Sequence, residues 1–205
     1  MLKNKKIKKF IQIGSSVEYG FVNSPQKESV AINATKLKSI YGKAKLKSTN
    51  LLLKENKKTK FPCIILRPYL IFGPGQNNHR LIPYIIEKCI KNKSFPCSNG
   101  RQIRNFIYVN DFVLAVYKSL FIKVSGKVIN VGSNRNYTVK FIINRITQII
   151  GKGLPIYGKI KMRRDEPLEL YPDLTKFKKF INLKKEIKIN SGLKETIKYY
   201  SKNLR

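Results

Sequence analysis

The chain has 205 residues, of which 42% are apolar, and its 43 Lys and Arg against 11 acidic residues give a formal net charge of +32. This length suits one domain of ordinary size, and apolar residues this plentiful exclude intrinsic disorder. No apolar run approaches the ~18 residues of a membrane span and no secretory cleavage site follows the N-terminus, so we expect no membrane association.

The first half of the chain alternates apolar and polar segments. Residues 9–13 form a short apolar run that ends at Gly14-Ser15-Ser16 and predicts a strand followed by a turn. A Lys-rich segment over about residues 35–58 has its apolar residues near helical spacing and predicts a helix. Residues 62–67 are a continuous apolar run that ends at Pro68, as expected for a strand buried on both faces.

The second half continues the alternation. It predicts helices over 81–90, 111–121 and 138–150, strands over 103–109 and 127–131, a short helix after Asp173 and a final helix after Ser191. Strands that alternate with helices predict an α/β fold with a largely parallel sheet. The sequence contains no G-x-G-x-x-G turn of the kind that opens a dinucleotide-binding unit.

The positive charge favours a polyanion as partner, but its distribution is even. Residues 1–100 carry 20 basic and 4 acidic residues, and residues 101–205 carry 23 and 7. Lys, Ile and Asn together make 79 of the 205 residues, a profile typical of compositional bias rather than of a localised site. We therefore expect no specific nucleic-acid binding, although a basic nucleic-acid-associated protein stays open as a third reading. The three cysteines have no metal-ligand spacing and suit the reducing cytoplasm.

A Tyr-x-x-x-Lys pair places a phenol and an ammonium on one face of a helix. A nearby ammonium favours the phenolate, so the pair suits proton transfer at a carbinol carbon, with a hydroxyl such as that of Ser15 holding the substrate oxygen. The pattern occurs three times, at Tyr41/Lys45, Tyr84/Lys88 and Tyr157/Lys161, which is near chance for 11 Tyr and 34 Lys. Only the first pair lies between a strand ending in Gly-Ser-Ser and a buried strand, so the context selects it.

Several further stretches extend this context along nearly the whole chain: residues 10–20, Glu28, residues 66–69, 72–74, 100–111 and 129–132, and the tail over 163–199. Together they resemble the extended short-chain dehydrogenase/reductase family of NAD-dependent nucleotide-sugar epimerases and dehydratases. The resemblance implies a partial Rossmann-type doubly wound parallel sheet that lacks its first strands, with a small C-terminal substrate-binding α/β portion. We expect residues 1–75 to belong to the NAD-binding domain and residues 76–205 mainly to the substrate portion, with 103–131 adding strands and a helix back to the core.

The resemblance also implies roles for individual residues. Tyr41 would be the general acid/base, Lys45 would assist it and hold the nicotinamide ribose, and Ser15 would bind the reacting sugar oxygen. Pro68 would line the nicotinamide side of the pocket. The residues implied in binding the nucleotide-diphosphate sugar are Ser16, Arg80, Arg104 and Arg163; an arginine suits a diphosphate because its guanidinium is a planar fork. The cofactor would be NAD or NADP.

Departures from the family pattern narrow the expected chemistry. Ser16 and Val17 stand where dehydratases of this family carry an acidic pair, so we expect an epimerase or a 4-ketoreductase acting at C4 of a hexose. Family members begin with about 100 further residues that hold the glycine-rich turn. We therefore expect a truncated chain with weak or no activity alone, and as partners either a second copy in a homodimer, which the resemblance implies, or a separate chain that supplies the missing strands. A non-catalytic nucleotide-sugar-binding remnant stays open as the second reading.

Overall fold

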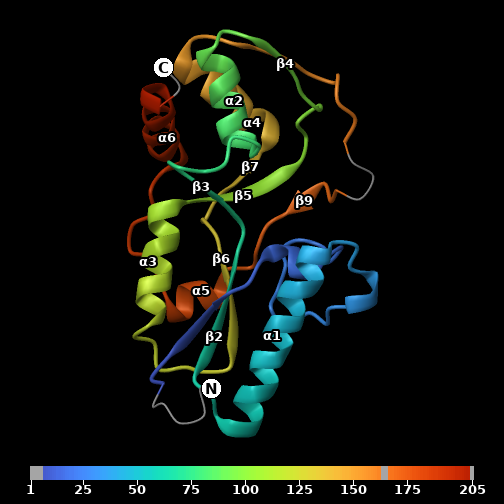
Figure 1. Ribbon diagram of the computed structural model, residues 1–205, viewed down its shortest axis with the longest axis vertical. Coiled ribbons are helices and arrows are strands. Elements are labelled where there is room, and N and C mark those ends of the chain that lie inside the picture. The colour runs from blue at the N-terminus through green and yellow to red at the C-terminus, as the bar shows by residue number, and fades with distance from the viewer. Residues whose placement is uncertain (1–6, 163–165, 204–205) are drawn as a thin grey trace. The chain divides into compact units, whose positions relative to one another are not determined.

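The computed structural model describes residues 7–162 and 166–203. These residues form two compact units (Figure 1). Unit 1 comprises the described residues up to Tyr69 together with Phe112–Gly132 and Pro172–Lys184, and unit 2 comprises Leu70–Asp111, Ser133–Tyr171 and the residues from Lys185 onward. The roles expected for residues 1–75 and 76–205 stay predictions, because the boundaries of a unit do not say what it binds.

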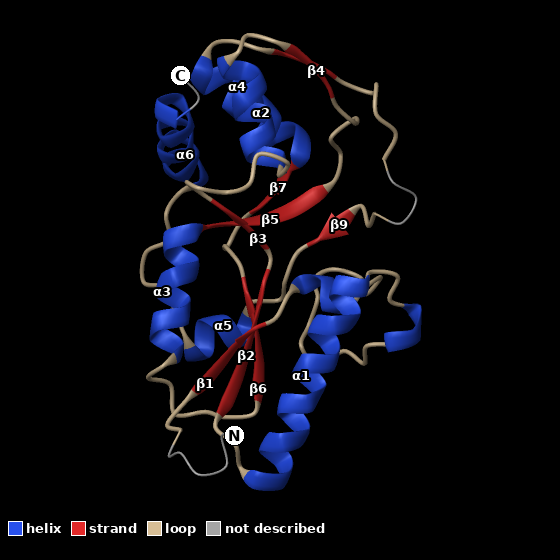
Figure 2. Cartoon of the chain, in the orientation of Figure 1, coloured by secondary structure: helices blue, strands red, loops and turns tan. Residues whose placement is uncertain are grey.

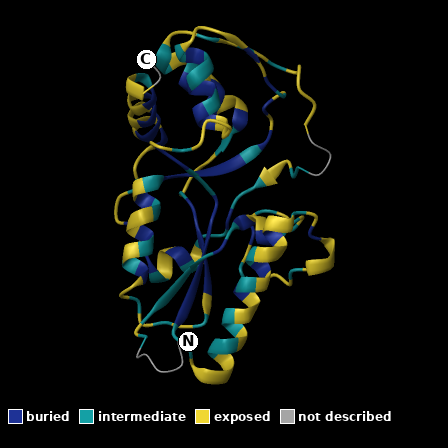
Figure 3. Cartoon of the chain, in the orientation of Figure 1, coloured by how far each residue is buried: buried dark blue, intermediate teal, exposed yellow. Residues whose placement is uncertain are grey.

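Unit 1 is built on a parallel sheet of three strands in the order β1-β2-β6. The strands are β1 (Phe10–Ile13), β2 (Cys63–Pro68) and β6 (Lys127–Val131), and β2 is buried along its whole length (Figures 2 and 3). A central parallel strand has covered faces and two neighbours, which explains its uninterrupted apolar sequence. The parallel α/β architecture expected from the sequence is confirmed.

Helix α1 (Ile40–Thr59) is the longest element of unit 1. It begins later than predicted because Ser39 is its N-cap and accepts a hydrogen bond from the Gly42 amide, while residues 34–36 form the separate 3₁₀ turn η2 (Ala34–Lys36). The remaining helical elements of this region are η1 (Ser16–Tyr19), α3 (Val109–Ser119) and α5 (Thr175–Phe180).

Unit 2 combines a mixed sheet with three helices. Its sheet contains β3 (Leu70–Phe72), β5 (Ile103–Tyr108), β7 (Asn136–Thr138) and β9 (Glu169–Leu170), and β5 runs parallel to β3 and β9 but antiparallel to β7. A separate pair is made by β4 (Ser94–Pro96) and β8 (Leu154–Ile156). The helices are α2 (Leu81–Ile90), α4 (Val139–Ile150) and α6 (Ile189–Asn203).

One apolar cluster fills unit 2. Apolar side chains of α2, α4 and α6 pack on β3 and β5, with Ile86, Ile142 and Leu193 completely buried. This burial explains why the apolar residues of α2 and α4 recur at helical spacing in the sequence. Among the described residues, no helix has the length and apolar character that crossing a bilayer requires.

Candidate active site

The loop after β1 carries Ser15. The Gly14 amide bonds the Leu66 carbonyl at 2.7 Å and closes the strand, and the chain then enters η1. Ser15 is the N-cap of this turn: its Oγ accepts from the Val17 amide at 3.3 Å, and its own amide donates to Glu18 Oε1 at 2.8 Å. This reciprocal capping box fixes the backbone of Ser15 and leaves its side chain half-buried.

Tyr41 and Lys45 lie on the first turns of α1, which packs against η1. The Lys45 ammonium donates to the Ile13 carbonyl at 2.8 Å and lies 5.6 Å from the centroid of the Tyr41 ring, which is 55% exposed. A Cβ atom at Gly42 would lie 3.0 Å from both the carbonyl oxygen and Cγ1 of Val17. Glycine at this position therefore allows α1 to approach the Ser15 loop closely.

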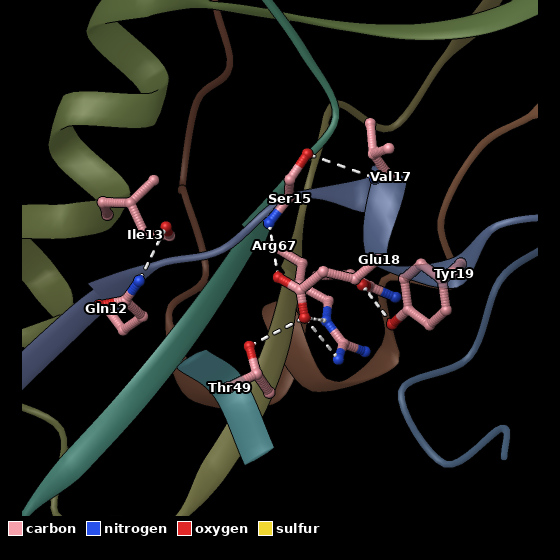
Figure 4. A network of polar contacts seen from close by, with 9 residues as sticks. Gln12, Ile13, Ser15, Val17, Glu18, Tyr19, Thr49 and Arg67 are labelled. Carbon is pink, nitrogen blue, oxygen red and sulfur yellow. Dashed lines mark hydrogen bonds and ion pairs between the residues drawn. The ribbon is translucent and has the colours of Figure 1, made fainter. Parts of the chain in front are cut away.

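A buried ion pair lies beneath the Ser15 loop (Figure 4). Glu18 Oε2 accepts hydrogen bonds from Thr49 Oγ1 at 2.8 Å and from Arg67 Nε at 2.9 Å. It also lies 2.8 Å from Arg67 Nη2. The side chains of Glu18 and Arg67 are 0% and 3% exposed. A charge this deeply buried is tolerated because each group has a charged partner and further hydrogen bonds.

A second layer of polar contacts extends this ion pair toward β6. The Arg67 guanidinium lies 4.6 Å from the centroid of the Tyr19 ring, and the Tyr19 hydroxyl donates to Asn130 Oδ1 at 2.7 Å. The Tyr69 hydroxyl donates to Gln26 Oε1 at 2.7 Å. Burial raises the pKa of both tyrosines, so both stay protonated and act as hydrogen-bond donors. Of the tyrosines beside the loop, Tyr41 is the exposed one.

The remaining predicted site residues have different surroundings. Ser16 is 4% exposed, and Pro68 is buried at the end of β2. Arg80 is the exposed N-cap residue of α2 and its side chain makes no capping bond. Arg104 is buried in β5 and donates to the carbonyls of Ile103 and Leu168 and to Glu166 Oε1, the last at 2.5 Å. Arg163 lies outside the described residues.

The structure brings Ser15, Tyr41 and Lys45 to one end of the unit 1 sheet. The three residues come from the β1 loop and from the first turns of α1, which are connected by the Lys45 bond to Ile13. The four residues Ser16, Arg80, Arg104 and Pro68 keep their assigned roles as predictions. No group of His, Cys, Asp and Glu in the described part of the chain has the arrangement of a metal site.

Sequence reasoning missed Glu18, Thr49 and Arg67 as parts of this arrangement. Arg67 ends a strand that reads as buried on both faces, and a buried guanidinium requires an anion. Residues 1–100 contain only four acids, so the candidates for that anion were few. A buried arginine together with so few acidic residues is the signal that could have predicted the ion pair of Arg67 with Glu18.

Comparison with known proteins identifies the family. The model of the NAD dependent epimerase/dehydratase family matches residues 1–132. A dTDP-glucose 4,6-dehydratase of Haemophilus influenzae is 26% identical over 174 residues, which cover 79% of this chain and 52% of that protein. An uncharacterised UDP-glucose epimerase of Bacillus subtilis is 24% identical, over 95% of this chain and 61% of its own length.

A solved structure agrees with these relatives. The UDP-glucuronic acid 4-epimerase of Bacillus cereus, in complex with UDP-glucuronic acid and NAD, superposes with a TM-score of 0.88 at 26% identity, over 100% of this chain and 64% of that one. The chain therefore has the Rossmann-type architecture expected from the resemblance, and it spans between about half and two thirds of the length of these relatives. It belongs to the NAD-dependent epimerase/dehydratase family of enzymes.

Proposed function

We propose that this chain carries the proton-transfer groups of a nucleotide-sugar epimerase or 4-ketoreductase that acts at C4 of a hexose. The observation that carries the proposal is the contact of the Lys45 ammonium with the Ile13 carbonyl, 5.6 Å from the centroid of the exposed Tyr41 ring. This hydrogen bond joins α1, which carries Tyr41, to the end of β1, which the loop with Ser15 follows. Epimerases among the relatives and solved neighbours support the assignment.

Each of the three side chains has one task in this reaction. The Ser15 hydroxyl binds the oxygen on C4 and orients it toward Tyr41. Tyr41 takes the proton of that hydroxyl when the carbinol is oxidised and returns it when the ketone is reduced. The Lys45 ammonium stabilises the phenolate that accepts this proton and that is formed again when the proton is returned, because an opposite charge nearby favours the ionised form.

The chain's own residues fit the nicotinamide end of the family's cofactor. An ammonium has three N–H donors, and Lys45 directs one of them to Ile13, which leaves donors for a ribose hydroxyl. Pro68, at the buried end of β2, is the proposed wall of this part of the pocket. NAD or NADP supplies the hydride acceptor for the carbinol carbon when bound, and both remain candidates.

The proposed substrate is a sugar linked to a nucleoside diphosphate. Arg104 and Arg163 are the proposed diphosphate ligands, with Ser16 and Arg80 as further contacts. Because Arg104 already bonds Glu166, substrate binding would exchange a carboxylate for a phosphate at the same guanidinium. Association with a second copy or with a separate chain stays a prediction; among the described strands, β1 has a neighbour on one side only, which supports it.

Substitution Tyr41→Phe tests the proposal. It removes the proton carrier and keeps the ring, so turnover of UDP-glucose with added NAD should fall below detection while the affinity for UDP-glucose changes less than about threefold. Tyr84→Phe is the matched control, since Tyr84 has a lysine at the same spacing, with Lys88 5.3 Å from its ring centroid. Turnover that survives in Tyr41→Phe would overturn the proposal. Binding of UDP-glucose without turnover in the unsubstituted chain would agree with the expected weak or absent activity of the chain alone and with the non-catalytic alternative.

A further inference from the structure

The two oxygens of the Glu18 carboxylate have different partners. Oε1 accepts from the Ser15 amide, at 2.8 Å. Oε2 accepts from Thr49 and Arg67, at 2.8 and 2.9 Å (Figure 4). The carboxylate thus connects the backbone of Ser15 to α1 and to β2.

The sequence provides the space for Oε1. A Cβ atom at Gly14 would lie 2.4 Å from Glu18 Oε1, closer than any side-chain contact allows. The φ angle of Gly14 is not positive, so the close neighbours of this glycine require it, and not the backbone conformation. Besides Glu18 Oε1, these neighbours are Ile65 Cγ2 and the Leu66 carbonyl oxygen, each 3.2 Å from the position of a Cβ atom. Gly14 therefore leaves the space in which the Glu18 carboxylate reaches the Ser15 amide.

Glu18 contacts Ser15 from the buried side of the loop. Its side chain is 0% exposed, so it does not reach the face of the loop that is open to solvent. The contact it makes is to the amide of Ser15, whereas the Ser15 hydroxyl accepts from Val17. Because a hydrogen bond to an ionised acceptor is about twice as strong as a neutral one, this contact restrains the rotation of the Ser15 backbone.

We propose that Glu18 is a positioning residue for Ser15: held by the Arg67 guanidinium, its carboxylate fixes the Ser15 amide and thereby aims the hydroxyl at the sugar oxygen. This inference rests on the proposed function, because it assumes that Ser15 binds that oxygen. A purely structural role would stabilise the fold equally through both oxygens. A positioning role acts through Oε1 alone.

Two substitutions separate these roles. Gly14→Ala should push Oε1 away from the Ser15 amide, because its Cβ would lie 2.4 Å from Oε1, whereas Thr49 and Arg67 bond the other oxygen, Oε2. Thr49→Val removes one bond to Oε2 and leaves the Ser15 contact intact, so it is the matched control. Both variants should melt at lower temperature than the unsubstituted chain, as circular dichroism would measure.

The specific readout is the contribution of the sugar 4-hydroxyl to binding. We expect the chain to bind UDP-glucose about tenfold more tightly than its 4-deoxy counterpart, since the hydroxyl donates to or accepts from Ser15. Gly14→Ala should bring this ratio close to one, as Ser15→Ala does, while Thr49→Val keeps it. The amide proton of Ser15 in the nuclear magnetic resonance spectrum should move upfield in Gly14→Ala and stay in Thr49→Val.

Each outcome decides between the proposals. If Gly14→Ala keeps both the ratio and the Ser15 amide signal, or if Thr49→Val lowers the ratio equally, positioning by Glu18 is wrong while the role of Ser15 stands. A ratio near one in the unsubstituted chain would overturn the role of Ser15 and, with it, the positioning proposal.

Discussion

Among the described residues, each of the two units contains one ion pair between a buried arginine and a glutamate, and the two pairs differ in access to water. In unit 1, Arg67 and Glu18 are 3% and 0% exposed, so the pair is sealed. In unit 2, Arg104 is 6% exposed but its partner Glu166 is 33% exposed. A sealed pair can only hold a structure together. A pair with an open carboxylate can also exchange its partner for another anion.

The interiors around the two pairs differ as well. Unit 2 has one large apolar cluster, and unit 1 also buries apolar side chains on its sheet, among them Cys63 and Ile65 in one cluster and the completely buried Ile64, Leu66 and Ile129. Beside it, unit 1 buries a polar network that includes Glu18, Arg67 and Asn130. The loop that carries Ser15 is thus held by directional bonds in addition to apolar packing, and such bonds fix the orientation of a loop.

Loss of Arg67 should have the largest effect. Arg67→Leu leaves the Glu18 carboxylate buried without its cation and should lower the free energy of unfolding by about 3–5 kcal/mol. Arg104→Leu should cost only about 1 kcal/mol, because Glu166 reaches water once its partner is lost. Urea unfolding followed by circular dichroism measures both values.

The double variant Arg67→Leu with Glu18→Leu serves as the control. A buried ion pair replaced by apolar side chains is often neutral for stability, so the double variant should regain most of the loss. Equal costs for Arg67→Leu and Arg104→Leu would contradict the distinction between a sealed and an open pair.

An intermediate effect is expected at Glu166. Glu166→Gln removes the carboxylate that competes for Arg104, so the affinity for UDP should rise about fivefold, equivalent to ~1 kcal/mol. Isothermal titration calorimetry measures this change. Glu87→Gln is the matched control, because Glu87 pairs with Lys91 on the surface of the same unit. An unchanged affinity in Glu166→Gln would mean that Arg104 does not exchange its partner.

The smallest effect concerns Asp111, a buried acid of unit 2 without an ion pair among the described contacts. Its Oδ2 accepts from the Ile187 amide at 2.9 Å, and burial raises the pKa of its carboxyl. A pKa raised in the folded state means that the contribution of Asp111 to stability is full below the unfolded-state pKa and is lost as the pH rises through the folded-state pKa.

Asp111→Asn should therefore melt slightly above the unsubstituted chain at about pH 7, and the difference should vanish at about pH 3, where the carboxyl is protonated. The amide oxygen of Asn still accepts from Ile187. Thermal melts at both pH values test this. A difference that is the same at both would show that ionisation of Asp111 does not cause it.

Much of the fold could be predicted because its main elements are periodic. The prediction for α2 agrees with its bounds, and α4 begins after its Thr138 cap and ends at Gly151, as the sequence indicates. The prediction missed β3, β4, β7, β8 and β9. Strands of two or three residues are too short to show an alternation, and they are fixed by their partners in space.

The site was predictable only in part, for a related reason. Tyr41 and Lys45 are one helical turn apart, so their spacing is visible in the sequence. Glu18 and Arg67 are 49 positions apart, and the Gly14 contact with Glu18 depends on the turn between them. Such pairing across the chain leaves no local pattern, and only the requirement of a buried arginine for an anion points to it.

The hydrogen bond from Lys45 to Ile13 makes the position of the Lys45 ammonium depend on the backbone of β1. The acceptor is a backbone carbonyl, so any residue at position 13 can provide it. What matters is where β1 ends relative to β2, through the pairing of Ile13 with Leu66. A slip of one residue in that register would move the carbonyl by about 3.3 Å and out of reach of the ammonium. The alignment of two strands, rather than the identity of a side chain, therefore keeps the positive charge of Lys45 beside Tyr41.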